Sequence, residues 1–421
     1  MGSVMKTVFS NANVIDGKGG AFHGFVVVEG REIVRVGHGE PRLSTTGYEV
    51  VDLGNKSLLP GFFDCHVHLR SDGLADPRAQ VLSDTDALCA LRSARNARRT
   101  IEAGITTIRD CGSTNFVDFS VRRAVEQGLV PGPRMVLSGK IICMTGGHGW
   151  NVGQQADGPD GVRKAAREQL RAGADNVKLI ATGGILTPGT EIGSAQLTVD
   201  ELRAGVEEAK KAGAISAAHA HGATGIRNAV RAGVDSIEHG YFLDDEGVEL
   251  MLERGTYLVA TSTAVRNVAT RGVEDGLLPD VHRKACEAVD SHIESFGRAW
   301  RAGVNLAMGT DSGVPFTRHG RNLEELAHLV EMGLGPMEAI QVSTLGSARL
   351  LRLDDRLGSI EEGKLADLVV CDGDPLRDIA VLQDKDRIEW VVKDGEVVIR
   401  RDGARATGDA SACDAFSPTP A

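Results

Sequence analysis

The sequence predicts an α/β fold: a (β/α)8 TIM-type barrel with a small β-sandwich domain that is built from both termini. Two observations lead to this prediction. Eight short apolar runs alternate with helical stretches between residues 60 and 357, which predicts a closed ring of parallel strands. Residues 1–59 and 358–405 instead carry short strands separated by Gly and Asp turns, and we assign them to one small domain.

The strand-like segments of the small domain lie at 7–9, 26–28, 33–36, 367–370 and 390–398. Residues 406–421 are mainly Ala, Ser, Thr and Pro and offer little to bury, so we expect a flexible tail there.

The barrel strands are predicted at the apolar runs 62–66, 105–108, 134–137, 176–179, 215–218, 234–237, 256–260 and 304–308. Five of the helical stretches end in Ala-Gly, as at Ala103-Gly104, directly before the next run. A Gly just past a helix can adopt the left-handed conformation that ends it. Thr198 and Glu201 have the spacing of a capping box at a helix start. An open doubly wound sheet is the alternative, but the sequence has no Gly-rich phosphate turn after its first predicted strand.

The composition excludes several classes of protein. The 421 residues include 47 Lys and Arg against 58 Asp and Glu, a formal charge of −11, which argues against nucleic-acid or anionic-membrane binding. The seven Cys are scattered without a CxxC pair, which favours a reducing compartment over a disulfide framework. No apolar run approaches the roughly 20 residues of a membrane span, and no signal pattern begins the chain, so we expect a soluble, cytoplasmic protein.

Polar side chains stand where the predicted strands end, and in a barrel the active site lies at this C-terminal face. These residues are His66, His68, Lys178, His219, His221, His239 and Asp311. His66 and His68 are two apart on a strand, so their side chains point to the same side. They are either packing histidines or ligands of a metal such as zinc, manganese, iron or nickel, which would compensate for burying them.

The other strand-end residues also allow two interpretations each. Lys178 is either a solvated charge or a desolvated amine that carbon dioxide converts to a carbamate. His219 and His239 are either structural histidines or further ligands. Asp311 is either a helix N-cap or the carboxylate that takes a proton from water on a metal.

The combination of these residues resembles the amidohydrolase superfamily over nearly the whole chain. The resemblance rests on the run Leu59-Pro60-Gly61-Phe62-Phe63-Asp64-Cys65-His66-Val67-His68, on Lys178 and His219, and on Ile237-Glu238-His239-Gly240 and Thr310-Asp311. It implies a binuclear metal centre, with zinc as the expected metal. One metal would be held by His66, His68 and Asp311 and the second by His219 and His239, with a carboxylated Lys178 and a hydroxide as bridges.

Two details of this resemblance concern the fifth strand. We favour His219 as the ligand because it directly follows the strand, and leave His221 to a supporting or substrate-binding position. Deaminases of the superfamily usually lack the Lys at the fourth strand and carry a Glu where Gly222 stands here, which disfavours that chemistry.

Within the superfamily, Met144-Thr145-Gly146-Gly147-His148-Gly149 and His239-Gly240-Tyr241 are similar to a branch of metal-dependent dipeptidases and N-acyl amino acid hydrolases, including ochratoxin-type amidases. In that branch His148 and Tyr241 would polarise the scissile carbonyl; otherwise His148 is an exposed loop histidine and Tyr241 a pocket wall. Arg318 and Arg321 either receive a substrate carboxylate or are solvated. Cys65 and Cys143 are expected to be inert.

The sequence therefore predicts a metal-dependent hydrolase that cleaves an amide bond of a small molecule, such as a dipeptide or an N-acyl amino acid, with Asp311 as the proton carrier. A cyclic amidohydrolase of the hydantoinase or dihydroorotase kind and a lactonase or organophosphate hydrolase are the alternatives. A non-catalytic assembly protein is disfavoured because every ligand position is filled. By analogy with relatives we expect a homo-oligomer.

Overall fold

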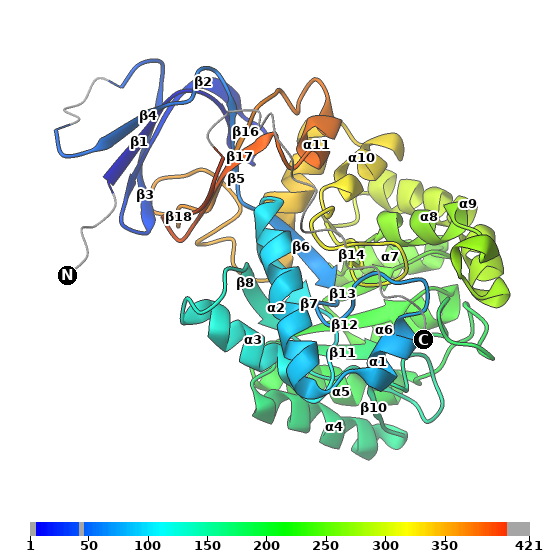
Figure 1. The fold of residues 1–421 in the computed structure, drawn as a ribbon. Helices are drawn as coiled ribbons and strands as arrows, with labels where there is room; N and C mark the ends of the chain where they lie inside the picture. The colour runs from blue at the N-terminus through cyan, green and yellow to red at the C-terminus, as the bar shows by residue number, and fades with distance from the viewer. Residues whose placement is uncertain (1–5, 42–45, 402–421) are drawn as a thin grey trace.

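The computed structural model describes residues 6–41 and 46–401, in which a mixed sheet lies beside a larger region of parallel strands and helices (Figure 1). The segment 406–421, which the sequence predicts to be a flexible tail, lies outside the described residues.

Strands from both ends of the chain pair in the sheet of the smaller domain. Its order is β18-β17-β16-β5-β1-β2-β3, and β4 pairs with β1. Its strands are β1 (Lys6–Ile15), β2 (Ala21–Glu29), β3 (Glu32–His38), β4 (Glu49–Asp52), β5 (Ser57–Pro60), β16 (Leu368–Cys371), β17 (Ile388–Lys393) and β18 (Glu396–Arg400). β5 and β16 run antiparallel with Pro60 opposite Leu368, so the N-terminal and C-terminal segments join directly.

This sheet encloses an apolar core of its own. Phe9 on β1 and Trp390 on β17 are not on neighbouring strands, yet their ring centroids lie 5.9 Å apart, and both belong to one buried cluster. The sheet therefore curls around a shared core. Seven of its strands follow one hydrogen-bonded path, and β4 pairs with β1 beside that path.

The larger domain is built on parallel strands. They form two sheets, with the orders β6-β7-β8 and β10-β9-β11-β12-β13-β14-β15. The strands are β6 (Phe62–Val67), β7 (Ile105–Asp110), β8 (Arg134–Leu137), β9 (Ile142–Cys143), β10 (Gln154–Gln155), β11 (Asn176–Ile180), β12 (Ile215–Ala220), β13 (Ser236–His239), β14 (Tyr257–Val259) and β15 (Leu306–Ala307). The Cys65 N–H donates to the Met308 carbonyl and the Asp175 N–H to the Leu137 carbonyl, so hydrogen bonds link the sheets at both sides. Each of the eight predicted runs overlaps one of these strands.

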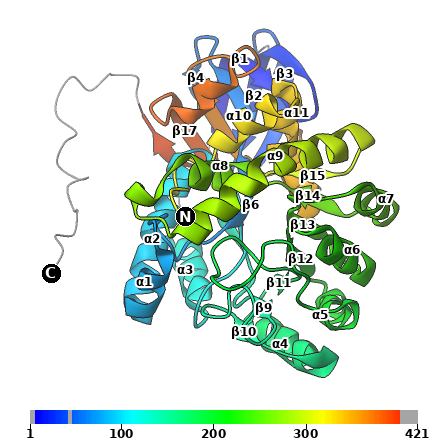
Figure 2. The ribbon, with the colours of Figure 1, turned by 90° about the vertical axis from the view of Figure 1, so that its right-hand side faces the viewer.

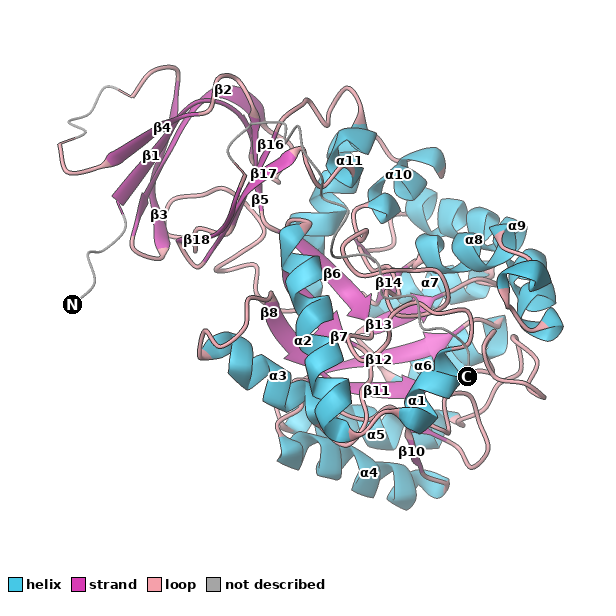
Figure 3. Cartoon of the chain, viewed as in Figure 1, coloured by secondary structure: helices cyan, strands magenta, loops and turns pink. Residues whose placement is uncertain are grey.

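Helices surround the parallel strands, and α4 to α7 lie outside β11 to β14 (Figures 2 and 3). The helices are α1 (Pro77–Ser83), α2 (Asp86–Glu102), α3 (Val117–Glu126), α4 (Gly158–Ala172), α5 (Val199–Lys211), α6 (Ala223–Ala232), α7 (Asp245–Arg254), α8 (Ser262–Thr270), α9 (Pro279–Ala302), α10 (Glu324–Glu331), α11 (Pro336–Gln341) and α12 (Ser347–Leu350). Shorter helical turns lie at Val273–Asp275, Val342–Gly346 and Ile379–Gln383. None of the helices in the described ranges is long and apolar enough to cross a membrane.

The local features predicted for the helix ends are present. The glycines of the five Ala-Gly pairs all have a positive φ: Gly104 (+88°), Gly173 (+107°), Gly213 (+72°), Gly233 (+91°) and Gly303 (+88°). Thr198 Oγ1 accepts from the Glu201 N–H while Glu201 accepts from the Thr198 N–H, which is the predicted capping box of α5. Each of these five helices ends just before a strand begins, at one face of the ring of strands. The strands therefore all end at the opposite face.

Candidate metal centre

The ends of the parallel strands meet at one cavity of about 730 Å³. Every residue that the sequence nominated for metal binding or catalysis lines this cavity: His66, His68, His148, Lys178, His219, His239, Tyr241 and Asp311. His221 lines it as well. The structure thus brings together side chains from β6, β11, β12 and β13 and from the segment after β15.

Three groups of potential ligand atoms are found among the described residues, each with all its atoms within 4.8 Å of one another, and two of them consist entirely of residues that line the cavity. The first of these two consists of His66, His68 and Asp311, and the second of His219, His221 and His239. The first group is the set predicted from the sequence. In the second, His221 stands beside the two predicted ligands, with its ring centroid 4.5 Å from that of His219 and 4.7 Å from that of His239.

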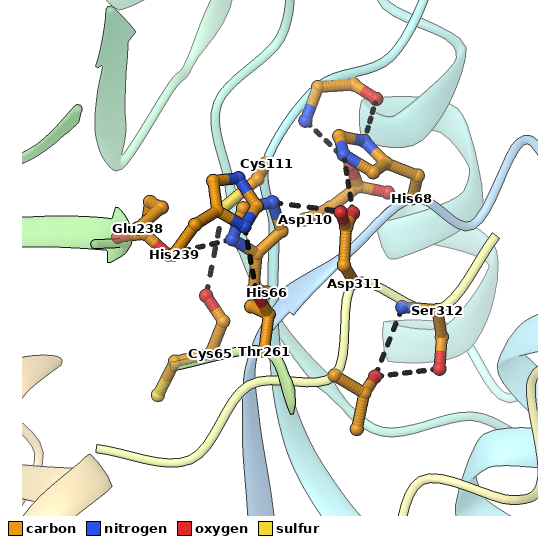
Figure 4. Close-up of polar contacts among 12 residues, drawn as sticks. Cys65, His66, His68, Asp110, Cys111, Glu238, His239, Thr261, Asp311 and Ser312 are labelled. Atoms are coloured by element: carbon orange, nitrogen blue, oxygen red, sulfur yellow. Dashed lines mark hydrogen bonds and ion pairs between the residues drawn. The ribbon is translucent and has the colours of Figure 1, made fainter. Parts of the chain in front are cut away.

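Hydrogen bonds fix which nitrogen of each predicted histidine ligand carries the proton. His66 Nδ1 donates to Glu238 Oε2 at 2.7 Å, and His68 Nδ1 donates to the Gly112 carbonyl at 3.1 Å (Figure 4). His219 Nε2 donates to the Gly183 carbonyl at 3.2 Å. Because carboxylates and carbonyls only accept hydrogen bonds, the other nitrogen of each ring keeps its lone pair.

His239 follows the same rule through a hydroxyl group. Thr261 Oγ1 donates its proton to the Ala260 carbonyl at 2.7 Å, and so it accepts from His239 Nδ1, which also lies at 2.7 Å. This leaves the lone pair on Nε2 of His239. In its neutral form, each of the four predicted histidine ligands therefore offers a lone pair, with the other nitrogen held by an oxygen acceptor, as in known metal sites.

Burial keeps most of these imidazoles neutral, which is the form that binds metal. It lowers the pKa of His66 to about 4 and the pKa values of His219 and His239 well below 6.5. Burial also lowers the pKa of His68, but Asp311 beside it raises that pKa above its ordinary value. Burial alone would raise the pKa of Asp311, yet His66 and His68 lower it to about 2, so this carboxylate is ionised at neutral pH.

The contacts of Asp311 indicate a cation. Its Oδ1 lies 3.5 Å from His66 Nε2 and 3.3 Å from His68 Nε2, and it has no hydrogen-bond partner among the described residues. His66 Nε2, which keeps its lone pair, and the Asp311 carboxylate oxygen both accept, so they repel unless a cation lies between them. The residues present therefore fit a divalent metal.

Lys178 provides a second indication. It lies on β11 with 2% of its surface exposed, and Nζ is buried without a hydrogen-bond partner in the part of the chain that the structure describes. An unpaired ammonium group is strongly disfavoured in such a place. A carbamate formed on this amine would instead be an anionic ligand between the two histidine groups, so the environment of Lys178 fits the modification predicted for it.

A buried ion pair contacts His66 of the first ligand group. Arg109 on β7 and Glu238 on β13 have fully buried side chains, and Arg109 Nη2 donates to Glu238 Oε1 at 2.6 Å. Burial opposes ionisation of Glu238, but Arg109 holds its pKa well below the ordinary value. Glu238 is therefore a permanent anion whose second oxygen orients His66.

Two residues of the site adopt strained backbone conformations. His239 has a φ of +74° and Asp311 a φ of +60°, in the left-handed region that side chains with a Cβ disfavour. The Asp311 N–H donates to the His66 carbonyl at 2.7 Å, which ties this turn to β6. Such strain costs about 1–3 kcal/mol for each residue and tends to occur at functional sites.

His148 and Tyr241 flank the second group of ligand atoms. The His148 ring stacks on His219 with centroids 4.3 Å apart, and burial lowers its pKa to about 4. Its Nδ1 lies 2.8 Å from Thr187 Oγ1, which accepts from the Gly149 N–H and can therefore donate to the ring, leaving Nε2–H as a donor. Tyr241 is 1% exposed, and burial raises the pKa of its phenol, which stays protonated.

Other residues discussed from the sequence have no direct part in this site. Arg318 and Arg321 are exposed and lie outside the cavity lining, and Arg321 pairs with Glu324. Burial raises the pKa of the Cys65 and Cys143 thiols to about 12, which disfavours their thiolates. The same holds for Cys111, which the sequence analysis did not single out and which comes close to His66 and Glu238. The six cysteines in the described ranges are all free of disulfide bonds.

Sequence reasoning missed three residues that shape the site. Glu238 stood inside a recognised motif, but its role depends on Arg109, which no spacing rule connects to it. Thr261 was not considered, although it holds His239. The one signal in the sequence was that Arg109, a charged residue, directly follows the predicted strand run 105–108 and belongs to the fully buried strand β7.

Comparisons with known proteins agree with this geometry. Residues 57–398 match the model of the amidohydrolase family. Ochratoxinase from Aspergillus niger is 32% identical over 369 residues, covering 81% of this chain and 75% of that protein. A Xaa-Pro dipeptidase structure with bound methionine in the active site is 37% identical, with a TM-score of 0.87 over 93% of this chain and 99% of that one. A prolidase complexed with N-methylphosphonate-L-proline is 34% identical, with a TM-score of 0.88 over 94% of this chain and 100% of that one.

These matches cover most of the chain, include both ends of the barrel, and confirm the superfamily and the two branches that the sequence motifs resemble. The solved relatives also confirm a fold of the TIM-barrel type. The chain is a hydrolytic enzyme and belongs to the amidohydrolase family.

Proposed function

We propose that this enzyme hydrolyses an acyclic amide bond in a small molecule, either a dipeptide or an N-acyl amino acid, with two divalent metal ions, expected to be zinc, in its cavity. The observation that carries the proposal is the pair of ligand-atom groups with the buried, unpartnered amine of Lys178 in the same cavity. The choice of an amide follows the ochratoxinase and dipeptidase relatives.

In this proposal, one cation would be held by His66, His68 and Asp311 and the second by His219 and His239, with a carboxylated Lys178 shared between them. When bound, such cations lower the pKa of water towards about 7 and polarise a carbonyl group. His221, which has one buried ring nitrogen without a hydrogen-bond partner, lies close enough to the second group to act as a further ligand or as a contact to substrate.

The protein's own side chains would move the proton. Asp311 is ionised and faces the cavity, so it can accept the proton of the attacking water and return it to the leaving amine. His148 is neutral, with Nε2–H as a donor, and can hydrogen-bond the carbonyl oxygen as negative charge develops there. The phenol of Tyr241 lies 3.4 Å from Thr261 Oγ1, a long contact that it can exchange for one to the substrate.

A panel of substrates tests the proposal. The purified enzyme is analysed for metal content and then assayed with dipeptides, N-acyl amino acids, a hydantoin, dihydroorotate and a lactone. We expect about two metal ions per chain in line with the two ligand groups, and release of free amino acid from the acyclic amides alone. Ring opening of the cyclic amides with no action on acyclic ones would refute the proposal in favour of a cyclic amidohydrolase.

The proposal also covers the division of the chain into domains, the arrangement of the small domain and the oligomeric state. The chain divides into a small β domain of residues 1–59 and 358–405 and a catalytic barrel of residues 60–357. The small domain has the layered arrangement of a sandwich, formed by the curled sheet around its own core. The enzyme acts on a small molecule as a homo-oligomer, which sedimentation velocity would test.

A further inference from the structure

The cavity is lined by both charged and apolar side chains. The apolar ones, called the apolar wall below, include Ile141, Trp150, Val152, Leu186, Val265 and Val268. Among the Lys and Arg residues that the structure describes, Arg70 and Lys178 are the ones that line the cavity, and Lys178 belongs to the candidate metal centre. The acidic side chains in the lining are Asp76 and Asp311.

Arg70 is buried, and no described carboxylate lies close enough to form an ion pair with its guanidinium. Arg70 is 6% exposed, its Nε is buried without a hydrogen-bond partner, and Nη1 donates to Ser71 Oγ at a long 3.5 Å. Burial lowers the pKa of Arg70 although Cys89, Asp110 and Asp84 lie near enough to raise it. Within the described ranges it forms no ion pair with a carboxylate, whereas Arg109, which is also buried, is paired with Glu238. Because a buried charge without a partner is costly, Arg70 is poised to bind an anion that enters the cavity.

The position of Arg70 suits the carboxylate of an amino acid. It follows His68 by two residues, so it extends from the same strand end that supplies two ligands of the candidate metal centre. In an N-acyl amino acid the carboxylate is separated from the scissile carbonyl carbon by only the amide nitrogen and the α-carbon. A guanidinium binds a carboxylate through two parallel hydrogen bonds, and the long arginine side chain can span this short separation.

We propose that Arg70 binds the free α-carboxylate of the amino acid that leaves, and so restricts the enzyme to amides with a C-terminal carboxylate. This inference rests on the proposed function and names the residue that selects its substrate class. The apolar wall then faces the remaining groups of the substrate and favours an apolar side chain and a bulky apolar acyl group. Arg318 and Arg321, the cations that the sequence suggested for this role, are exposed and lie outside the cavity lining.

Binding of a product and its neutral analogue tests the role of Arg70 without relying on turnover. Isothermal titration calorimetry compares L-phenylalanine with L-phenylalaninamide on the metal-loaded enzyme. We expect wild type to bind the carboxylate roughly 10- to 150-fold more tightly, the range for a hydrogen bond to a charged group. Arg70→Met should bind both compounds alike, Arg70→Lys should keep part of the preference, and Arg318→Met should match wild type.

The result can overturn the inference in two ways. A wild-type enzyme without preference for the carboxylate refutes it, and so does an Arg70→Met variant that keeps the preference at wild-type metal content. Hydrolysis of N-acyl amino acids is measured separately on the same proteins. If the carboxylate preference depends on Arg70 but no amide is cleaved, the proposed function fails while the binding role of Arg70 stands.

Discussion

The replacement Glu238→Gln tests whether the buried ion pair holds the candidate metal centre. Glu238 accepts hydrogen bonds from Arg109 and Ser236 through Oε1, both at 2.6 Å, and from His66 through Oε2 at 2.7 Å. A glutamine has one acceptor and one donor at the same two places. Whichever way its amide turns, an N–H group faces either the Arg109 guanidinium or the His66 ring.

The replacement should lower both the stability of the protein and its affinity for metal. Removing one partner of a buried ion pair destabilises a protein by about 3–5 kcal/mol, because the remaining charge is left unpaired. Losing the acceptor that orients a histidine ligand weakens metal binding by roughly 10- to 100-fold. We therefore expect Glu238→Gln to lower the free energy of unfolding by about this amount and to bind zinc more weakly.

Urea unfolding of the metal-free protein followed by circular dichroism, together with zinc titration against a competing chelator, measures the two effects. Glu331→Gln is the matched control: Glu331 pairs with Arg266 at 2.6 Å but is 57% exposed, so its loss should change stability by about 1 kcal/mol or less. A double replacement, Arg109→Met with Glu238→Met, removes both charges and should restore much of the stability but not the zinc affinity, because His66 still lacks its acceptor.

The reasoning would be refuted if Glu238→Gln unfolded at the urea concentration of wild type and bound zinc equally well. Recovery of zinc affinity in the double replacement would refute one part of it, the orientation of His66 by Glu238.

Three further predictions concern the cavity. Lys178→Ala should retain less metal by atomic emission and lose activity, and added propionate should restore part of it by supplying a carboxylate; full metal content with normal turnover would contradict a carbamate at this position. Asp311→Asn should keep its fold and metal but lose about 10²–10⁴ in turnover, since the proton acceptor is gone, and wild-type turnover would remove Asp311 from the proton path. His148→Asn and Tyr241→Phe should each lower kcat by about 10²–10³ with a smaller change in KM if each stabilises the carbonyl oxygen, whereas a change in KM alone would assign them to substrate binding.

Much of the fold follows from local patterns in the sequence. A strand or a helix end depends on residues that are close in the chain. The apolar runs therefore predicted eight of the ten parallel strands, all except the two-residue strands β9 and β10, and Gly104 and Gly303 predicted helix ends that the structure contains. The ligand positions could be predicted for a related reason. Parallel strands in a barrel all end at one face, so a polar residue at a strand end is placed by the fold class alone.

Tertiary structure decided which of these residues contact one another. Arg109 and Glu238 lie 129 residues apart in the sequence, and their pairing depends on the way β7 and β13 face each other across the ring. The same holds for the arginines. Arg70 lines the cavity and is buried, whereas Arg318 is exposed and lies outside the lining, and the residue type does not distinguish them. The sequence by itself determined the elements and the chemistry at their ends, because those are local properties; only the folded chain decided the partners, because distance across a barrel has no counterpart in spacing along the chain.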